Sequence, residues 1–171
     1  MKWLVLLLLA GVAHADPVPS LDTGGTFGAA YHAPGDLVTR LGLRVTISAA
    51  WPDLHVGLAT TLQSERGPDT TDSSASIGVD TTMRISDDLW VHGLLEKDMH
   101  SARGFDGELG LRWMEGKGWV GVDAIARTPG CTGCNMNTAV GLAASIGYHA
   151  DGFYPFTIGV LLEILIAAVG H

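Results

Sequence analysis

The chain has few basic residues, only two cysteines and few signs of helix. Lys and Arg together number ten, against eighteen Asp and Glu, and they form no basic run. Because a basic surface provides most of the affinity for nucleic acid, we expect no nucleic-acid partner. Twenty-three glycines are spread through the apolar segments, which disfavours helices after the N-terminal segment.

The first fifteen residues have the three parts of a secretory signal peptide. Lys2 precedes an apolar core over residues 3–9, and Ala13-His14-Ala15 fits an A-x-A cleavage site. This core is far shorter than the about 20 residues of a membrane-spanning helix, which argues against an uncleaved anchor. We predict cleavage before Asp16, export, and a single domain over residues 16–171, a length that allows a real core.

The two cysteines, Cys131 and Cys134, form a C-x-x-C motif. A thioredoxin-like redox site needs this motif at the start of a helix, whereas here it falls between two predicted strands. A four-cysteine zinc site would need a second such motif. We therefore predict a disulfide in an external loop, the usual state of such a pair after export, with redox or metal use as alternatives.

Alternation of apolar and polar residues recurs along the mature chain and predicts strands. Most of these strands are longer than the about 5–6 residues usual in globular proteins and match the about 9–11 that cross a bilayer at a tilt. The predicted strands cover residues 24–32, 37–50, 53–63, 74–85, 88–98, 103–114, 117–127, 137–149 and 153–166.

The two faces of these strands differ in chemistry. In the stretch over residues 37–51, Leu41 and Leu43 share an apolar face, while Arg40 and Arg44 share the opposite face with small residues. A water-soluble barrel would carry many Lys and Glu on its outside. A polar face of small residues and both signs of charge instead suits a narrow lumen, with the apolar face against lipid. The predicted lumen charges are Arg40, Arg44, Asp80, Arg84, Glu108, Arg112 and Asp123.

The connections between strands also follow a pattern. The short connections AWPD, SDD, MEGKG and HADG alternate with the longer SERGPDTTDSS, KDMHSAR and TPGCTGCNMN. Outer-membrane barrels have short periplasmic turns and longer external loops. Aromatic residues flank the four short connections, which predicts a girdle at one membrane interface. The predicted girdle is Trp51, Trp90, Trp113, Trp119, Tyr148, Phe153, Tyr154 and Phe156.

In strand length, faces and turns, residues 24–166 resemble the small bacterial outer-membrane β-barrel proteins of about eight to ten strands. This architectural resemblance implies an all-β fold, a closed antiparallel up-and-down transmembrane β-barrel. It also implies outer-membrane lipid and the barrel assembly machinery as partners, in a Gram-negative bacterium. Two features depart from the family: nine predicted strands instead of an even number, and a chain that ends at His171 instead of an aromatic residue.

No catalytic set, metal site or cofactor is predicted. Ser145 lies in A-x-S-x-G, but no helix follows it, as a hydrolase nucleophile elbow requires. The barrel deacylases that act on lipid A use His-x-Ser, which is absent here. Barrel proteases use acidic and histidine residues near the rim, and Asp106, Glu108, Asp123 and His100 could be arranged in that way, yet carboxylates beside lumen arginines are more often neutralising pairs. His55 and His92 lack metal-ligand spacing and are interpreted as lumen or rim residues.

The sequence leaves several functions open. The leading hypothesis is a non-enzymatic outer-membrane barrel with a structural or surface-interaction role. A small pore, a soluble secreted or periplasmic barrel that binds a ligand, and a barrel enzyme that acts on lipid or peptide are the alternatives.

Overall fold

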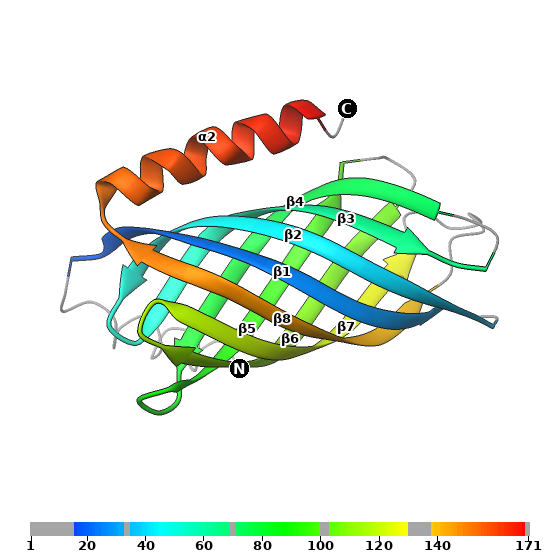
Figure 1. Cartoon of the computed structure of the whole chain (residues 1–171), viewed down its shortest axis with the longest axis horizontal. Helices are drawn as coiled ribbons and strands as arrows, with labels where there is room; N and C mark the ends of the chain where they lie inside the picture. Colours follow the sequence, from blue (N-terminus) through cyan, green and yellow to red (C-terminus); the bar gives the residue numbers. More distant parts are fainter. Residues whose placement is uncertain (1–15, 33–34, 69–70, 100–102, 130–137, 170–171) are drawn as a thin grey trace, which may run out of the picture.

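The structure is a computed structural model in which eight strands and one helix are described (Figure 1). The described residues are 16–32, 35–68, 71–99, 103–129 and 138–169. The elements are β1 (Val18–His32), β2 (Asp36–Trp51), β3 (Leu54–Arg66), β4 (Thr71–Arg84), β5 (Leu89–Asp98), β6 (Arg103–Glu115), β7 (Gly118–Pro129), β8 (Ala139–Asp151) and α2 (Phe153–Val169). The predicted signal peptide, His100, and the predicted disulfide between Cys131 and Cys134 lie outside the described residues.

Each strand pairs antiparallel with its chain neighbours, and β1 pairs with β8 to close a barrel. At this seam Asp22 lies opposite His149. The start of β1, the end of β8 and the connections at residues 52–53, 85–88 and 116–117 all lie at one end, which we call the short-turn end. The prediction of an all-β, closed, up-and-down barrel of about eight to ten strands is confirmed.

The prediction of a ninth strand over residues 153–166 is wrong, because this segment forms α2. The segment is apolar apart from Thr157 and Glu163, and periodicity cannot distinguish a buried strand from a helix in such a run. Gly152 takes a positive φ of 115°, which redirects the chain after β8. Pro155 then lies in the first helical turn, where its missing N–H is not needed. Because β1 already pairs with β8, a further strand would have no free edge.

The strands run further than predicted. β1 begins at Val18 instead of residue 24, and β3 and β4 extend through most of the predicted loop SERGPDTTDSS. Only residues 67–70 join β3 to β4, so this connection is no longer than the one over residues 85–88. The predicted contrast between short and long connections is correspondingly weaker. Ser and Thr are common in loops, but here they pair across the two strands, with Ser64 opposite Ser73.

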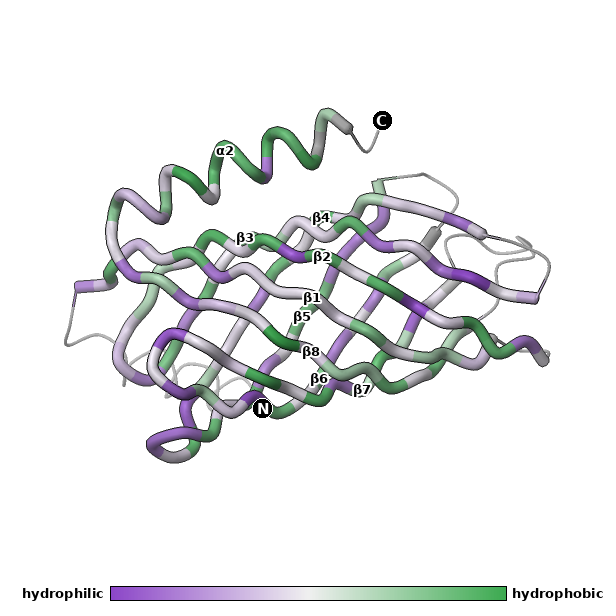
Figure 2. The backbone as a smooth tube through the Cα atoms, in the orientation of Figure 1, coloured by the Kyte–Doolittle hydropathy of each residue, from purple (hydrophilic) through white to green (hydrophobic). Residues whose placement is uncertain are grey.

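Hydrophilic and hydrophobic residues alternate along the strands, as the changes of colour in Figure 2 show. Burial shows that the polar side chains point into the lumen and the apolar ones outward. On β2, the side chain of Leu43 is 63% exposed, whereas its neighbour Arg44 is 5% exposed. Every strand contributes large apolar side chains to the outer surface, among them Phe27, Leu41, Leu58, Val79, Leu95, Leu109, Val122 and Leu142. Continuous apolar surface of this extent marks a surface that contacts lipid or another protein.

Helix α2 lies along the outer wall and contacts mainly β1, β2 and β3 (Figure 1). The approach is close at Gly159, where an added Cβ would lie 2.5 Å from Ile47 Cγ2 and 2.7 Å from Leu21 Cδ1. Leu21 and Thr60 belong to the outward face of their strands, yet both are buried because α2 covers them. Among the described residues, no helix has the length and hydropathy needed to cross a membrane.

Glu163 is the one charged residue of α2, and it is buried against the barrel wall. Burial raises the pKa of its carboxyl group to about 7, and hydrogen bonds with the Ile47 backbone and the Thr60 side chain offset this only in part. The oxygen Oε1 has no hydrogen-bond partner among the described residues. The protonated form of Glu163 is therefore the one that suits the docked helix.

We predict that α2 docks more weakly as the pH rises. The docked state holds the Glu163 proton more tightly than the undocked state, so its stabilisation is fully present below the ordinary glutamate pKa and is lost as the pH rises toward about 7. Hydrogen exchange of the α2 amides, corrected for intrinsic rates, should become faster over this range. Glu163→Gln should abolish the change, while Glu115→Gln at an exposed turn should keep it. An unchanged pH response in Glu163→Gln would contradict the prediction.

Candidate functional site

Most of the predicted lumen charges lie inside the barrel. The buried ones are Arg40, Arg44, Asp80, Glu108, Arg112 and Asp123. The structure places Arg84 elsewhere, since its side chain is 39% exposed and its Nε bonds Asp53 Oδ1 at 2.7 Å. In the alternation along β4, Arg84 falls on the side that faces the lumen. It is the last residue of β4, however, so its side chain reaches the turn between β2 and β3.

Arg127 organises the end of the lumen away from the short turns. Its guanidinium donates to both oxygens of Glu65 at 2.8 Å and to both oxygens of Asp106 at 2.6 and 2.9 Å. Gln63 also donates to Asp106, at 3.2 Å. Bidentate arginine–carboxylate pairs are strong and geometrically restrictive, so this cluster fixes β3, β6 and β7 relative to one another.

Glu108 joins β2 to β6 across the middle of the lumen. Its two oxygens lie 2.5 Å from Arg44 Nη2 and 3.3 Å from Arg40 Nη2. Thr61 accepts a hydrogen bond from Arg44 Nε at 3.3 Å and donates to Glu96. Ion pairs between distant strands therefore fill the lumen at this level.

His92 bridges two carboxylates nearer the short-turn end. Its Nε2 lies 3.1 Å from Asp80 and its Nδ1 lies 3.0 Å from Asp123, and the ring is fully buried. Ser145 donates to Asp123 at 2.8 Å, and Arg112 lies 3.7 Å from Asp80. Ser145 therefore bonds a carboxylate and not an imidazole, which differs from the Ser–His pair of a Ser-His-Asp triad.

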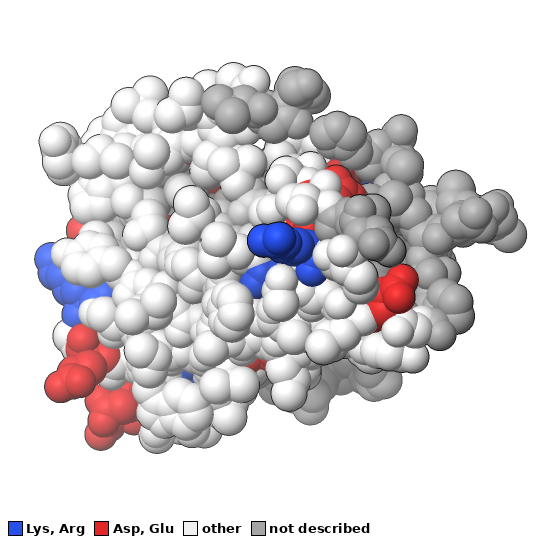
Figure 3. Space-filling model, turned by 45° about the vertical axis from the view of Figure 1, so that its right-hand side comes forward, with Lys and Arg blue, Asp and Glu red and all other residues white. Residues whose placement is uncertain are grey.

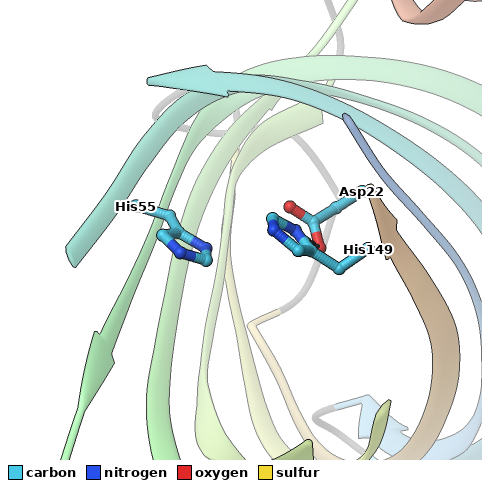
Figure 4. Close-up of side chains that lie close together, drawn as sticks. All are labelled: Asp22, His55 and His149. Atoms are coloured by element: carbon cyan, nitrogen blue, oxygen red, sulfur yellow. Dashed lines mark hydrogen bonds and ion pairs between the residues drawn. The ribbon is translucent and has the colours of Figure 1, made fainter. Parts of the chain in front are cut away.

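A second cluster, formed by Asp22, His55, His149 and Asp151, lies at the short-turn end, and Figure 4 shows its first three side chains pointing into the barrel. His149 Nδ1 lies 3.1 Å from Asp22, and its Nε2 lies 3.0 Å from Asp151. The ring of His55 stacks on His149 at a centroid distance of 4.8 Å. A cavity of about 540 Å³ is lined by His55, His149, Asp151 and Trp90, among others.

The structure divides the predicted aromatic girdle into two groups. Trp113, Tyr148, Phe153 and Tyr154 are exposed on the outside, and Trp51 and Phe156 are partly exposed. Trp90 and Trp119 lie inside, at 7% and 5% exposure, because they share strand parity with lumen residues and not with the outer face. There Trp90 contacts the His55 ring, and the Arg112 guanidinium lies 4.2 Å from the Trp119 ring centroid. These two tryptophans narrow the lumen instead of meeting lipid.

Three charged residues of the lumen network, Glu65, Glu96 and Arg127, are not among the lumen charges predicted from the sequence. Glu65 falls in a segment interpreted as a loop, and Arg127 is the last residue of a predicted strand. Glu96 shares strand parity with His92, so alternation along β5 could have identified it. The pairings of the network depend on strand register across the barrel, which no local pattern reports.

These observations define the chain as a closed eight-stranded up-and-down barrel with an ion-paired lumen. Ail, the attachment invasion locus protein of Yersinia pestis, solved with the heparin analogue sucrose octasulfate, is similar at 11% identity and a TM-score of 0.53, covering 80% of this chain and 100% of its own. The outer membrane enzyme PagL is similar at 15% identity and a TM-score of 0.53, covering 74% of this chain and 98% of its own. At these identities the likeness is one of fold, and it confirms the architectural resemblance predicted above. No protein-family model and no curated protein matches the chain.

The network predicts that two arginines, both predicted from the sequence to be lumen charges, contribute unequally to the free energy of unfolding. Arg44→Leu leaves the buried Glu108 without its 2.5 Å partner and should lower the free energy of unfolding by about 3 kcal/mol. Arg84→Leu removes an exposed pair and should cost at most about 1 kcal/mol. Urea unfolding in lipid vesicles measures both values. Equal losses for the two variants would show that the Arg44 pair is not buried in the folded barrel.

Proposed function

We propose that this chain is an outer-membrane β-barrel protein that is neither a pore nor an enzyme and has a structural or surface-interaction role. The observation that carries the proposal is the lumen, which is crossed at successive levels by buried ion pairs. The fold places apolar side chains outside and these pairs inside. A barrel built in this way is a rigid membrane element whose contacts with other molecules are made by its ends and its outer wall.

The outer surface supports a membrane location. Most of the face shown in Figure 3 is uncharged. Large apolar side chains such as Leu109 and Ile146, each 64% exposed, stand on the outer wall where a soluble barrel would carry charge. A soluble ligand-binding barrel would also need an apolar interior, whereas this interior holds arginines and carboxylates. The observed faces therefore favour the membrane barrel over the soluble alternative.

The interior supports a closed barrel over a pore. An eight-stranded barrel is only wide enough for side chains to fill it. Here Arg127, Glu108 and His92 each bond residues of other strands at a different level of the lumen. A solute would have to break several charge-assisted hydrogen bonds in turn. The geometry therefore supports a barrel that does not conduct.

The arrangement around Ser145 supports a non-enzymatic role. Its hydroxyl is buried in the lumen and donates to Asp123, so it faces neither lipid nor a histidine base. The similar fold of PagL, which is an enzyme, does not transfer its activity, since the two chains share 15% identity. Six buried lumen carboxylates are engaged with arginine, histidine or hydroxyl groups, which suits neutralisation better than catalysis: Glu65, Asp80, Glu96, Asp106, Glu108 and Asp123.

The membrane location predicts a depth-dependent cost for charge on the outer wall. Leu43 lies near the middle of β2 and Leu37 near its end, and both are more than 60% exposed. Leu43→Arg should cost about 2–4 kcal/mol in lipid vesicles, and Leu37→Arg about 0–1 kcal/mol, because water reaches the strand end. Unfolding by urea in vesicles provides the measurement. A barrel that unfolds reversibly in water without lipid or detergent, with no cost at Leu43, would contradict the location.

The closed lumen predicts the absence of channel activity. Purified barrel, inserted into planar bilayers at an amount that gives regular insertion of a porin control, should produce no discrete conductance steps. Insertion is verified on the same preparation by the heat-dependent shift in gel mobility of a folded barrel. Reproducible unitary steps from folded protein would overturn the non-conducting assignment and favour the small pore.

A further inference from the structure

We infer that the short-turn end of the barrel binds one divalent transition-metal ion, with Zn²⁺ as the best match, through Asp22, His55 and His149. The donor atoms of these three side chains all lie within 4.8 Å of one another. They come from β1, β3 and β8, and their side chains converge inside the barrel (Figure 4). Two imidazoles and one carboxylate form a donor set that Zn²⁺ takes in proteins.

The distances suit a small ion after a modest inward movement. Zn–N and Zn–O bonds of about 2.0–2.2 Å in a tetrahedron separate neighbouring donors by about 3.3–3.6 Å. His149 Nδ1 and Asp22 Oδ1 already lie 3.1 Å apart. The ion would replace this hydrogen bond, so His55 is the side chain that has to approach, and its ring already stacks on His149.

Asp151 provides the support that a metal-binding histidine needs. Its carboxylate lies 3.0 Å from His149 Nε2 and accepts a hydrogen bond from that nitrogen. This hydrogen bond orients the ring with Nδ1 toward Asp22 and His55, and Nδ1 offers its lone pair to the ion once its proton is lost. A carboxylate bound to the outer nitrogen of a ligand histidine is a recurrent arrangement at zinc sites, because it orients the ring and raises its basicity.

The site has access and room for a further ligand. The cavity of about 540 Å³ at this end is lined by His55, His149 and Asp151, and its wall includes the small side chain of Ala50. Within the described part of the chain three protein donors converge, so a water molecule or a solute can complete a tetrahedron. The ion would therefore be reached from the short-turn side without opening the ion-paired lumen.

The other histidine cluster inside the barrel is less suited to a cation. His92, Glu108 and Asp123 also bring three donors together. However, Glu108, one of these three donors, is already paired with two arginines, Arg40 and Arg44. The His92 ring is fully buried, and Arg112, which lies 3.7 Å from the Asp80 carboxylate that His92 bonds, repels an incoming cation. We therefore expect the cluster of Asp22, His55 and His149 to bind the ion and the cluster of His92, Glu108 and Asp123 not to bind it.

Metal binding at the short-turn end would strengthen the closure of the barrel. Asp22 and His149 face each other across the seam between the first and last strands, and His55 lies on β3. One ion would tie three strands together at the end where the chain enters the barrel and leaves for α2. An ion that binds only the folded barrel raises its stability by mass action.

The test uses tag-free mature protein, folded in detergent micelles and stripped with a chelator. Titration with Zn²⁺ against a chromophoric chelator should give one equivalent bound, and Co²⁺ should produce visible absorption bands of a protein-bound ion. His55→Gln, His149→Gln and Asp22→Asn should each weaken Zn²⁺ binding by more than about 100-fold, and Asp151→Asn by about 10-fold, in the range known for outer-shell carboxylates. Zn²⁺ should also raise the temperature at which gel mobility changes to the unfolded form.

Two controls keep folding and binding apart. His32→Gln, at the opposite end of β1, should bind Zn²⁺ as the wild type does, and the heat-dependent gel shift reports whether each variant is folded. The proposal is overturned if folded wild-type protein takes up no Zn²⁺, or if a folded His55→Gln/His149→Gln double variant binds it equally well. Loss of binding in folded His92→Gln, with His55→Gln unaffected, would assign the ion to the other cluster and also overturn the proposal.

Discussion

Charges inside a narrow barrel have to be paired, and the rest of this structure depends on that constraint. An arginine that leaves water loses solvation worth several kcal/mol, which only close carboxylates can offset. Arg44 and Arg127 meet this requirement with carboxylates from strands distant in the sequence. Because each pair requires one relative position of its strands, the network favours one register and one closure. The same pairs occupy the space through which a solute would pass.

The two ends of the barrel are built differently. Away from the short turns, bidentate contacts of Arg127 consolidate the interior. At the short-turn end, ring contacts take the place of these arginine pairs, and the His55 ring contacts both Trp90 and His149. From this end α2 turns back along the outer wall, where Gly159 permits close approach to β1 and β2. The seam between β1 and β8 therefore has the proposed metal site inside and the start of α2 beside it.

Alternation in the sequence was sufficient to place most side chains on the correct side of the wall. It was insufficient where a segment lacks alternation or where a strand ends. Residues 153–166 are almost entirely apolar, so their pattern does not distinguish a helix from a strand. The closure of the barrel by eight other strands decides between them. Arg84 has lumen parity but leaves the interior because β4 ends there. Nearness to the short turns predicts that Trp90 and Trp119 belong to the aromatic girdle. Their positions in the alternation of β5 and β7 indicate the lumen instead, where both are buried.

The sequence by itself determined the class of fold and the two faces of each strand, because a period of two is a local property that neighbouring residues express directly. Only the tertiary structure decided which charges pair, that the barrel has eight strands, and that Asp22, His55 and His149 meet. These outcomes depend on register and on curvature around the closed barrel. Register and curvature accumulate from one strand pair to the next around the barrel. Residues far apart in the sequence can therefore become neighbours although no local pattern indicates it, as Asp22 and His149 do at a separation of 127 positions.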